Sequence, residues 1–338
     1  MHALWYIFEP DVTGTRIRDA LTRAAQRGVQ VRLLVDAVGS GSLSNAFLKP
    51  LRDAGGEVER FNRWRIERHS RLLNYRNHRK ILVCDGDVAF TGGINITDTE
   101  NEDVRGDAAY RDTHLKLEGN AAHGLNLVFL EDWFYACGRA VKGPEYFPMT
   151  EFDPSTAVPV QILDSGPDLA IETIKTAFFA AIGSAKQRVY LTTAYFVPDD
   201  TMLMALQAAA LRGVDVRVLV SRESDSRTVM AAQRSYFDEL VQNQVRIFEY
   251  LPRMLHAKTL VVDDWFAVVG TSNFDNRSFR LNFEVVAIVY GSLLAAELAQ
   301  VFETDLASAE EITSKSRAHM PVIPRFYEAV ARLFAPLF

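Results

Sequence analysis

The chain has few of the features that would assign it at once to a secreted or membrane-spanning class. It carries two cysteines, Cys84 and Cys137, in 338 residues. Two thiols do not make a disulfide framework, so a reducing compartment is expected. No run of about eighteen apolar residues occurs, so no segment of this sequence is expected to span a membrane. The first residues, MHALWYIFEP, contain no basic leader and no small-residue cleavage site, so no signal peptide is expected.

The chain also lacks an excess of positive charge. Lys and Arg number 37 against 43 Asp and Glu, which gives a net charge of −6. This balance argues against nucleic acid as a partner, because such binding depends on cations that neutralise phosphates. The hydrophobic fraction of 48% is typical of a globular protein with a substantial core.

What the sequence does contain is a second copy of itself. Residues 27–36, RGVQVRLLVD, match residues 212–221, RGVDVRVLVS. Residues 77–95 match residues 255–273 in the same order. A repeat of this length is the signature of a duplicated structural unit.

Each copy alternates short β-branched strands with helical stretches, which is typical of βαβ units. The predicted fold class is α/β, with two pseudo-twofold-related lobes, each a mixed, largely parallel sheet flanked by helices. Four prolines between residues 141 and 159 indicate a linker. We therefore expect lobe one at residues 1–150 and lobe two at residues 151–338.

Each copy also carries a histidine, a lysine and an asparagine at one spacing. The histidine and lysine are two residues apart, so an extended strand would place both on one face, roughly 7 Å apart. The asparagine follows the histidine by 17 residues in both copies. A solvated strand end would explain one such stretch, but the matched pair indicates a site for an anion. The two sets are His78, Lys80 and Asn95, and His256, Lys258 and Asn273.

The pattern His-x-Lys-x-x-x-x-Asp, followed by Gly-x-x-Asn and present twice, resembles the phospholipase D superfamily. Segments such as YRDTHLKLEG, LVFLEDWFYACG and FDNRSFRLNFEV are similar to bacterial cardiolipin synthases, and the resemblance covers nearly the whole chain. It implies a phosphatidyltransferase that forms cardiolipin from phosphatidylglycerol through a covalent phosphohistidine. It also implies that no cofactor and no metal take part.

The resemblance assigns roles to the paired residues. His78 is the expected nucleophile and His256 the expected acid, although pseudosymmetry leaves the opposite assignment open. The lysines and asparagines are expected to hold the phosphate oxygens, as transfer without a metal requires. Asp85 and Asp263 belong to the motif, but they occupy tight-turn positions, and we interpret them as structural.

A histidine in either role needs an acceptor for its second ring nitrogen. Each lobe offers one candidate downstream of its own histidine. Asp112 follows His78 by 34 residues, and Glu284 follows His256 by 28 residues. Glu284 lies in a strongly apolar strand, so we expect it to be buried with a partner. For Asp112 a surface acid is the alternative.

Two segments are candidates for contact with a membrane surface. One is a basic, aromatic stretch whose alternative is a solvated loop. The other is the apolar C-terminal segment 325–338, either an interfacial helix or a helix docked on the core. The residues predicted to bind lipid are Arg63, Trp64, Arg65, Arg68 and Arg71.

Other functions stay open at this stage. A hydrolytic phosphodiesterase of the same superfamily would use the same residues with water as the acceptor. A catalytically inactive membrane scaffold is disfavoured, because both motifs are intact. The resemblance places the protein at the cytoplasmic side of the inner membrane, and the sequence makes no prediction of oligomeric state.

Lobe two opens with a predicted strand at 158–164 and a helix at 168–185 that have no counterpart in lobe one. We therefore expect lobe one to be truncated at its N-terminus and to leave an apolar patch exposed near residues 3–25. The natural protein would then be longer and anchored in the membrane.

Overall fold

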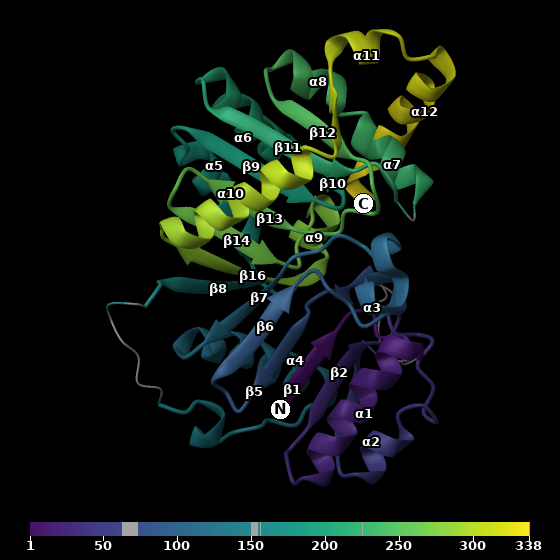
Figure 1. Ribbon diagram of the computed structural model, residues 1–338, viewed down its shortest axis with the longest axis vertical. Coiled ribbons are helices and arrows are strands. Elements are labelled where there is room, and N and C mark those ends of the chain that lie inside the picture. The colour runs from purple at the N-terminus through teal and green to yellow at the C-terminus, as the bar shows by residue number, and fades with distance from the viewer. Residues whose placement is uncertain (63–73, 150–154, 156, 225, 338) are drawn as a thin grey trace.

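The computed structural model describes residues 1–338 except 63–73, 150–154, 156, 225 and 338. Two sheets flanked by helices lie one above the other along the long axis, one for each copy of the repeat (Figure 1). The five residues predicted to bind lipid between Arg63 and Arg71 lie outside the described residues.

The first sheet has six strands in the order β3-β2-β1-β5-β6-β7. Its strands are β1 (His2–Trp5), β2 (Arg32–Asp36), β3 (Glu57–Phe61), β5 (Ile81–Cys84), β6 (Val88–Gly92) and β7 (His114–Glu118). The α-helices of this half are α1 (Val12–Gln26), α2 (Lys49–Asp53), α3 (Glu102–Arg105) and α4 (Asn120–Cys137).

The second sheet repeats this order as β12-β11-β9-β13-β14-β16 and adds β17, β8 and β4 (Arg76–Asn77) at its margins. Its other strands are β8 (Val160–Ser165), β9 (Arg188–Thr193), β11 (Asp215–Ser221), β12 (Arg246–Tyr250), β13 (Thr259–Val262), β14 (Phe266–Gly270), β16 (Asn282–Tyr290) and β17 (Ala309–Ile312). A separate pair joins β10 (Phe196–Val197) to β15 (Phe274–Asp275). The α-helices are α5 (Thr173–Ser184), α6 (Asp200–Leu211), α7 (Arg227–Arg234), α8 (Phe237–Gln242), α9 (Asn276–Arg280), α10 (Ser292–Leu306), α11 (Ser314–Ala318) and α12 (Val322–Arg332).

The α/β class and the duplication are confirmed, but the sheets are not largely parallel. In each half three neighbouring strands, beginning with β1 or β9, run parallel. The strands that follow the histidine motif are antiparallel to their neighbours. The reason is local, because tight turns after Cys84 and Val262 reverse the chain at once and so form hairpins.

The two copies begin their first helices in the same way. Asp11 caps α1 by accepting the backbone N–H of Gly14, and Asp199 caps α6 by accepting that of Met202. Each aspartate follows a proline, in FEPD and FVPD, and supplies an acceptor that the first turn of a helix lacks.

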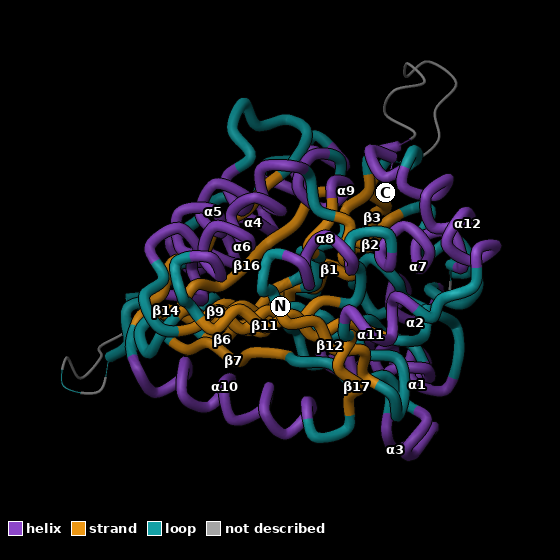
Figure 2. The backbone as a smooth tube through the Cα atoms, turned by 90° about the horizontal axis from the view of Figure 1, so that it is seen from above, coloured by secondary structure: helices purple, strands orange, loops and turns teal. Residues whose placement is uncertain are grey.

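Strand alternation produces a core on both faces of each sheet. Ala3 and Trp5 pack with α1, whereas Leu4 packs with α4 on the opposite face. In lobe two, Leu191 packs with α5 and α6, whereas Tyr190 packs with α10. The view from above shows helices above and below the strands (Figure 2).

The predicted apolar patch near residues 3–25 is wrong. The first sheet lacks counterparts of β8 and α5 among the described residues, as expected. Ala3, Leu4 and Trp5 are nevertheless buried. Leu43, Leu48 and other residues of the loop after β2 pack with α1 and with Ala3 and Trp5, so these two strand residues are covered.

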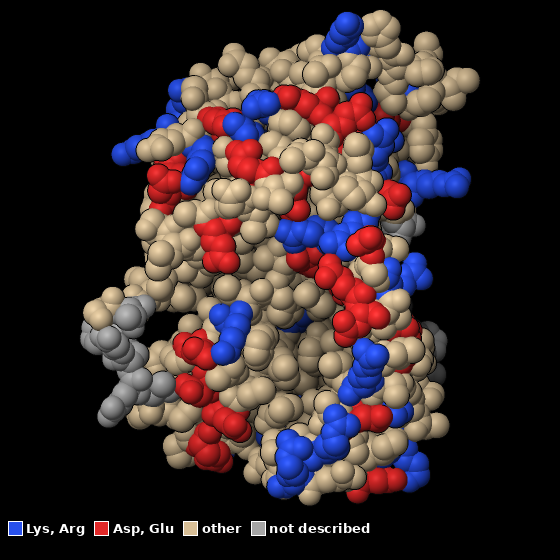
Figure 3. Space-filling view, viewed as in Figure 1, with Lys and Arg blue, Asp and Glu red and all other residues tan. Residues whose placement is uncertain are grey.

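Helix α4 joins the two lobes. It packs on the first sheet, and its core also contains Phe283, Val285 and Ala287 from β16. The lobes are therefore held together by continuous apolar packing, in addition to the linker. Lys and Arg are intermixed with Asp and Glu on the face seen in Figure 3. None of the helices in the described part of the chain has the length and apolar character needed to cross a bilayer.

The two motif aspartates occupy the same turn but differ in their partners. Asp85 and Asp263 both have a positive φ, of 54° and 51°, which confirms the turn positions. The Asp263 carboxylate accepts the backbone N–H groups of Lys186, Gln187 and Arg188 at 3.0, 2.8 and 3.0 Å. The Asp85 carboxylate has no hydrogen bond within the described residues.

We predict that Asp263→Asn destabilises the protein by about 1 kcal/mol more than Asp85→Asn, because Asp263 alone accepts charge-assisted hydrogen bonds. Asparagine tolerates the positive φ at both sites, so the pair is matched. Burial opposes ionisation of Asp263, but the three N–H groups outweigh it and lower its pKa. Its contribution is therefore present above the unfolded-state pKa of about 4 and is lost as the pH falls through the lower folded-state value. Urea unfolding of both variants measures this, and equal midpoints would contradict it.

Candidate active site

The two histidine motifs enter the site on extended segments that immediately precede strands. His78 and Lys80 lie between β4 and β5, and His256 and Lys258 lie just before β13. The expectation that they lie on the strands themselves is wrong. Before its own strand begins, each of these segments pairs with the backbone of the opposite lobe.

This pairing between lobes is reciprocal. Strand β4 runs parallel to the start of β16, and the backbone N–H of His78 donates to the carbonyl oxygen of Phe283 at 2.9 Å. In the other copy, Leu255 forms a bridge with Arg111, and the N–H of His256 donates to the Arg111 carbonyl oxygen at 2.7 Å. Each histidine backbone is therefore fixed by the other half of the chain.

The carboxylates that hold the two imidazole rings also come from the opposite lobe. Nδ1 of His78 lies 3.0 Å from the carboxylate of Glu284, and Nδ1 of His256 lies 2.7 Å from that of Asp112. The pairing of each acid with the histidine of its own lobe is wrong. Asp112 follows Arg111 and Glu284 follows Phe283, so each acid lies one residue beyond the carbonyl that holds the opposite histidine. The alternative of a surface position for Asp112 is also excluded, because its side chain is 3% exposed.

Glu284 is buried within β16 as expected, and polar neighbours hold it as an anion. The Thr271 hydroxyl donates to it at 2.5 Å, and the side-chain amide of Asn282 donates at 3.1 Å. Burial alone would raise the pKa of Glu284, but His78, Lys80 and Thr271 outweigh burial and lower it. Thr271 thus positions the acid that holds His78.

Both lysines are buried behind the histidines. Nζ of Lys80 donates to the carbonyl oxygen of His78 at 2.8 Å, and Nζ of Lys258 donates to that of His256. Burial, reinforced by the nearby Lys258 charge, lowers the pKa of Lys80 to about 7. The pKa of Lys258 is also lowered by burial. Two buried ammonium groups that repel each other would be stabilised by an anion between them.

Burial also lowers the pKa of both histidines. A neutral imidazole that donates from Nδ1 to a carboxylate keeps its lone pair on Nε2. Both histidines line one cavity of about 590 Å³ together with Asn95 and Asn273. The geometry thus brings both motifs to a single space.

The two asparagines differ in how free they are to bind a ligand. Asn95 accepts the backbone N–H of Ile7 at 3.2 Å and donates to Glu100 at 2.7 Å. The side-chain oxygen of Asn273 is buried without a hydrogen-bond partner among the described residues, and so is the Ser278 hydroxyl. Helix α9 is capped by Asp275, which accepts the Ser278 backbone N–H.

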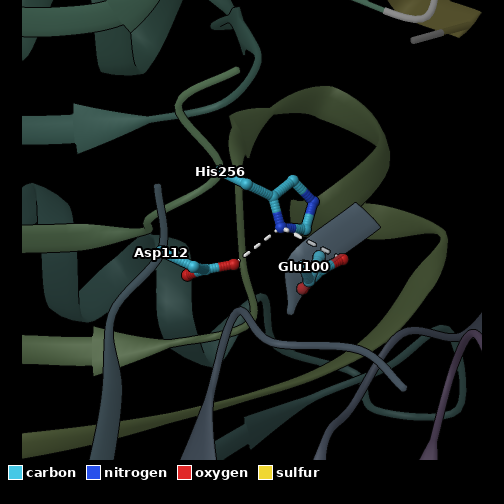
Figure 4. A group of neighbouring side chains, drawn as sticks. All are labelled: Glu100, Asp112 and His256. Atoms are coloured by element: carbon cyan, nitrogen blue, oxygen red, sulfur yellow. Dashed lines mark hydrogen bonds and ion pairs between the residues drawn. The ribbon is translucent and has the colours of Figure 1, made fainter. Parts of the chain in front are cut away.

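Glu100 is a site residue that the sequence reasoning missed. It lies in a short 3-10 helix, η2 (Asp98–Glu100), five residues after Asn95, where lobe two has Ser278 five residues after Asn273. Its carboxylate approaches Nδ1 of His256 to 3.8 Å, beside Asp112 (Figure 4). The repeat spacing did not reveal Glu100, because the equivalent position in lobe two carries serine.

Glu100, Asp112 and His256 offer three ligand atoms within 4.8 Å of one another, and within the described residues they are the group that could hold a metal ion. Nδ1 of His256 is already hydrogen-bonded to Asp112, and the Glu100 carboxylate lies 3.8 Å from the same nitrogen. Ion pairing and hydrogen bonding therefore account for this group.

Arg79 and Tyr6 complete the surroundings of His78, and the sequence reasoning missed both. Arg79 points away from the cavity and forms buried ion pairs with Asp132 of α4 and Asp164 of β8, at 2.7 and 2.8 Å. Its Nε also donates to the carbonyl oxygen of Glu284 at 3.0 Å. The Tyr6 ring packs edge-on against the His78 imidazole at 4.9 Å between centroids.

Comparison with known proteins agrees with this geometry. The family model described as "Cardiolipin synthase, PLD-like domain" matches residues 3–109 and 178–306. Cardiolipin synthase 2 of Bacillus cereus is 43% identical over the whole chain, and a cardiolipin synthase of Geobacillus sp. is 41% identical. The chain spans 66% and 67% of the length of these two relatives.

A phosphatidylserine synthase from Haemophilus influenzae shares the fold, with a TM-score of 0.73 over 99% of this chain and 87% of that one, at 16% identity. The duplicated histidine motifs, the shared cavity and the matches over the whole of this chain lead to one assignment. The chain belongs to the cardiolipin synthase family of phospholipase D-like proteins.

Proposed function

We propose that the protein is a phosphatidyltransferase that forms cardiolipin from two molecules of phosphatidylglycerol. The observation that carries the proposal is the pair of histidines on one cavity, each with its Nδ1 on a carboxylate. Similarity to cardiolipin synthases over the whole chain supports the choice of substrate.

In the first step, Nε2 of His78 attacks the phosphorus of phosphatidylglycerol. The bond from phosphorus to the glycerol oxygen breaks, and His256 donates a proton to that oxygen, so glycerol leaves. The phosphatidyl group is then bound covalently to His78. The Glu284 carboxylate stabilises the positive charge that forms on the ring.

In the second step, His256 accepts the proton of a hydroxyl group on a second phosphatidylglycerol. The freed oxygen attacks phosphorus, the bond to His78 breaks, and cardiolipin leaves. Lys80 and Lys258 neutralise the phosphate oxygens, with the free side chains of Asn273 and Ser278 as further contacts. Water in place of the second lipid would give hydrolysis by the same residues.

The protein is proposed to act at a membrane surface, because both substrates are lipids. We assign it to the cytoplasmic face of the inner membrane, with anionic phospholipid as its partner. Nucleic acid is not a proposed partner, in keeping with the net charge of −6.

Product analysis by mass spectrometry tests the reaction. Incubation with phosphatidylglycerol vesicles should give cardiolipin and free glycerol. Phosphatidic acid as the only lipid product would show that the protein is instead a hydrolytic phosphodiesterase. No change in the lipid would contradict both functions.

His78→Ala and His256→Ala should each lower turnover by at least about a thousandfold, because each removes a reacting group. His319→Ala is the matched control, since His319 is exposed and its Nδ1 lies 2.8 Å from the backbone carbonyl oxygen of Lys315. Initial rates of cardiolipin formation measure the effect. Near-normal rates in either site variant would exclude the assigned role.

Glu100→Gln should move the alkaline limb of the pH–rate profile to lower pH by about one unit. The negative charge of Glu100 favours protonated His256, and its removal lowers the pKa of the acid that glycerol departure needs. Glu102→Gln is the control, because Glu102, at the start of α3, is an exposed acid that pairs with Arg253. A profile that superimposes on that of the control would show that Glu100 has no such influence.

A further inference from the structure

The C-terminal helix α12 is arranged opposite to an ordinary surface helix. Its large apolar side chains point to solvent, and one of its acids is buried. Val322, Ile323 and Phe326 are 82%, 81% and 69% exposed, whereas Glu328 is 4% exposed. Apolar residues then continue along the same face to the end of the described chain. The exposed apolar residues of this face are Val322, Ile323, Phe326, Tyr327, Leu333, Phe334 and Leu337.

Polar contacts hold the helix in this orientation. Glu328 forms a buried ion pair with Arg317 at 2.7 Å, and Arg317 also binds Asp238 of α8 at 2.8 Å. The guanidinium of Arg332 lies 4.3 Å from the centroid of the Tyr236 ring. Only small residues of this segment, such as Ala331, reach the core. The outward direction of the apolar side chains is therefore fixed by the fold.

This apolar face is continuous with the mouth of the active-site cavity. Leu337 lines that cavity together with Val229 of α7. The next residue of α7, Met230, lines a second groove of about 490 Å³, whose opposite wall includes Pro324 and Tyr327 of α12. Helix α7 thus separates the active-site cavity from a groove that opens beneath the apolar face.

Among the described residues, Arg227 is the cation of this groove for which the structure gives no ion pair. Arg222 and Arg234 line it but are paired with Glu310 and Glu249. Arg227 lines it without an ion pair or hydrogen bond among the described residues. The corner of the molecule that holds α11 and α12 is mostly uncharged in the space-filling view (Figure 3). This arrangement suits a bilayer, because the apolar face can contact the acyl region and Arg227 at its base can contact the phosphate layer.

We propose that α12 and the segment after it form the surface by which the protein docks on an anionic phospholipid bilayer. Phe326, Ile323 and Val322 enter the acyl region, and Arg227 meets a lipid phosphate in the groove. Docking through this face places the active-site mouth, at Leu337, against the lipid layer from which the substrate would enter. The proposal rests on the proposed function for its choice of partner.

The test uses the full chain, with Ile323→Glu/Phe326→Glu as the docking variant. Leu293→Glu is the matched control, because Leu293 is 79% exposed on α10, which lies away from α12 in Figure 1. Sedimentation with phosphatidylglycerol-containing vesicles should show binding weakened at least about tenfold in the docking variant and unchanged in the control. Arg227→Ala should reduce the preference for these vesicles over phosphatidylcholine vesicles.

Turnover is measured in parallel on vesicles and on a short-chain phosphatidylglycerol dissolved as monomers. The docking variant should lose turnover on vesicles and keep it on the monomeric lipid. Vesicle binding by the wild type without turnover on either substrate would contradict the proposed function. Weakened vesicle binding by the docking variant would still support the docking surface in that case. Wild-type vesicle binding by the docking variant would overturn the proposal.

A second copy of the chain is the competing occupant of this face. Sedimentation velocity without lipid distinguishes it. A dimer in the wild type that becomes a monomer in the docking variant, with no change in vesicle binding, would also overturn the proposal.

Discussion

The exchange of backbone and carboxylate between the two lobes is the interaction on which the site depends. Each histidine donates its backbone N–H to a carbonyl oxygen of the opposite lobe, and the next residue along that lobe's chain holds the imidazole. Since the backbone bond fixes the segment and the carboxylate fixes the ring, both histidines face one cavity. Neither lobe could form this arrangement alone, which gives a physical reason for the duplication within one chain.

The two copies differ in the residues that surround the two histidines. His256 has a second carboxylate, Glu100, near its Nδ1, whereas the equivalent position beside His78 carries Ser278 with a free hydroxyl. Arg79 reinforces the His78 side by joining it to α4 and β8, and the equivalent residue in lobe two is Ala257. The two halves thus share a geometry but differ in charge. In the proposed mechanism, this difference favours His256 for proton transfer and His78 for attack on phosphorus.

The sequence predicted the parts of the site that repeat and failed where contacts cross between the copies. Identical spacing identified the histidines, lysines and asparagines, because duplication preserves local order. The acids were found because one candidate lies downstream of the histidine in each lobe, but spacing along the chain cannot tell which histidine each acid meets. Glu100 was missed because it has no matching partner in the second copy. The buried face near Ala3 was mispredicted, because residues of a loop fill it in place of a helix.

The central claim, that each carboxylate holds the histidine of the other lobe, can be tested by nitrogen-15 NMR of the imidazole groups in Glu284→Gln. The structure predicts that the Nδ1 resonance of His78 shifts, although His78 is 206 residues away in sequence, while that of His256 stays in place. Asp112→Asn should show the reverse. A shift of the His256 resonance in Glu284→Gln, with His78 unaffected, would contradict the exchange between lobes.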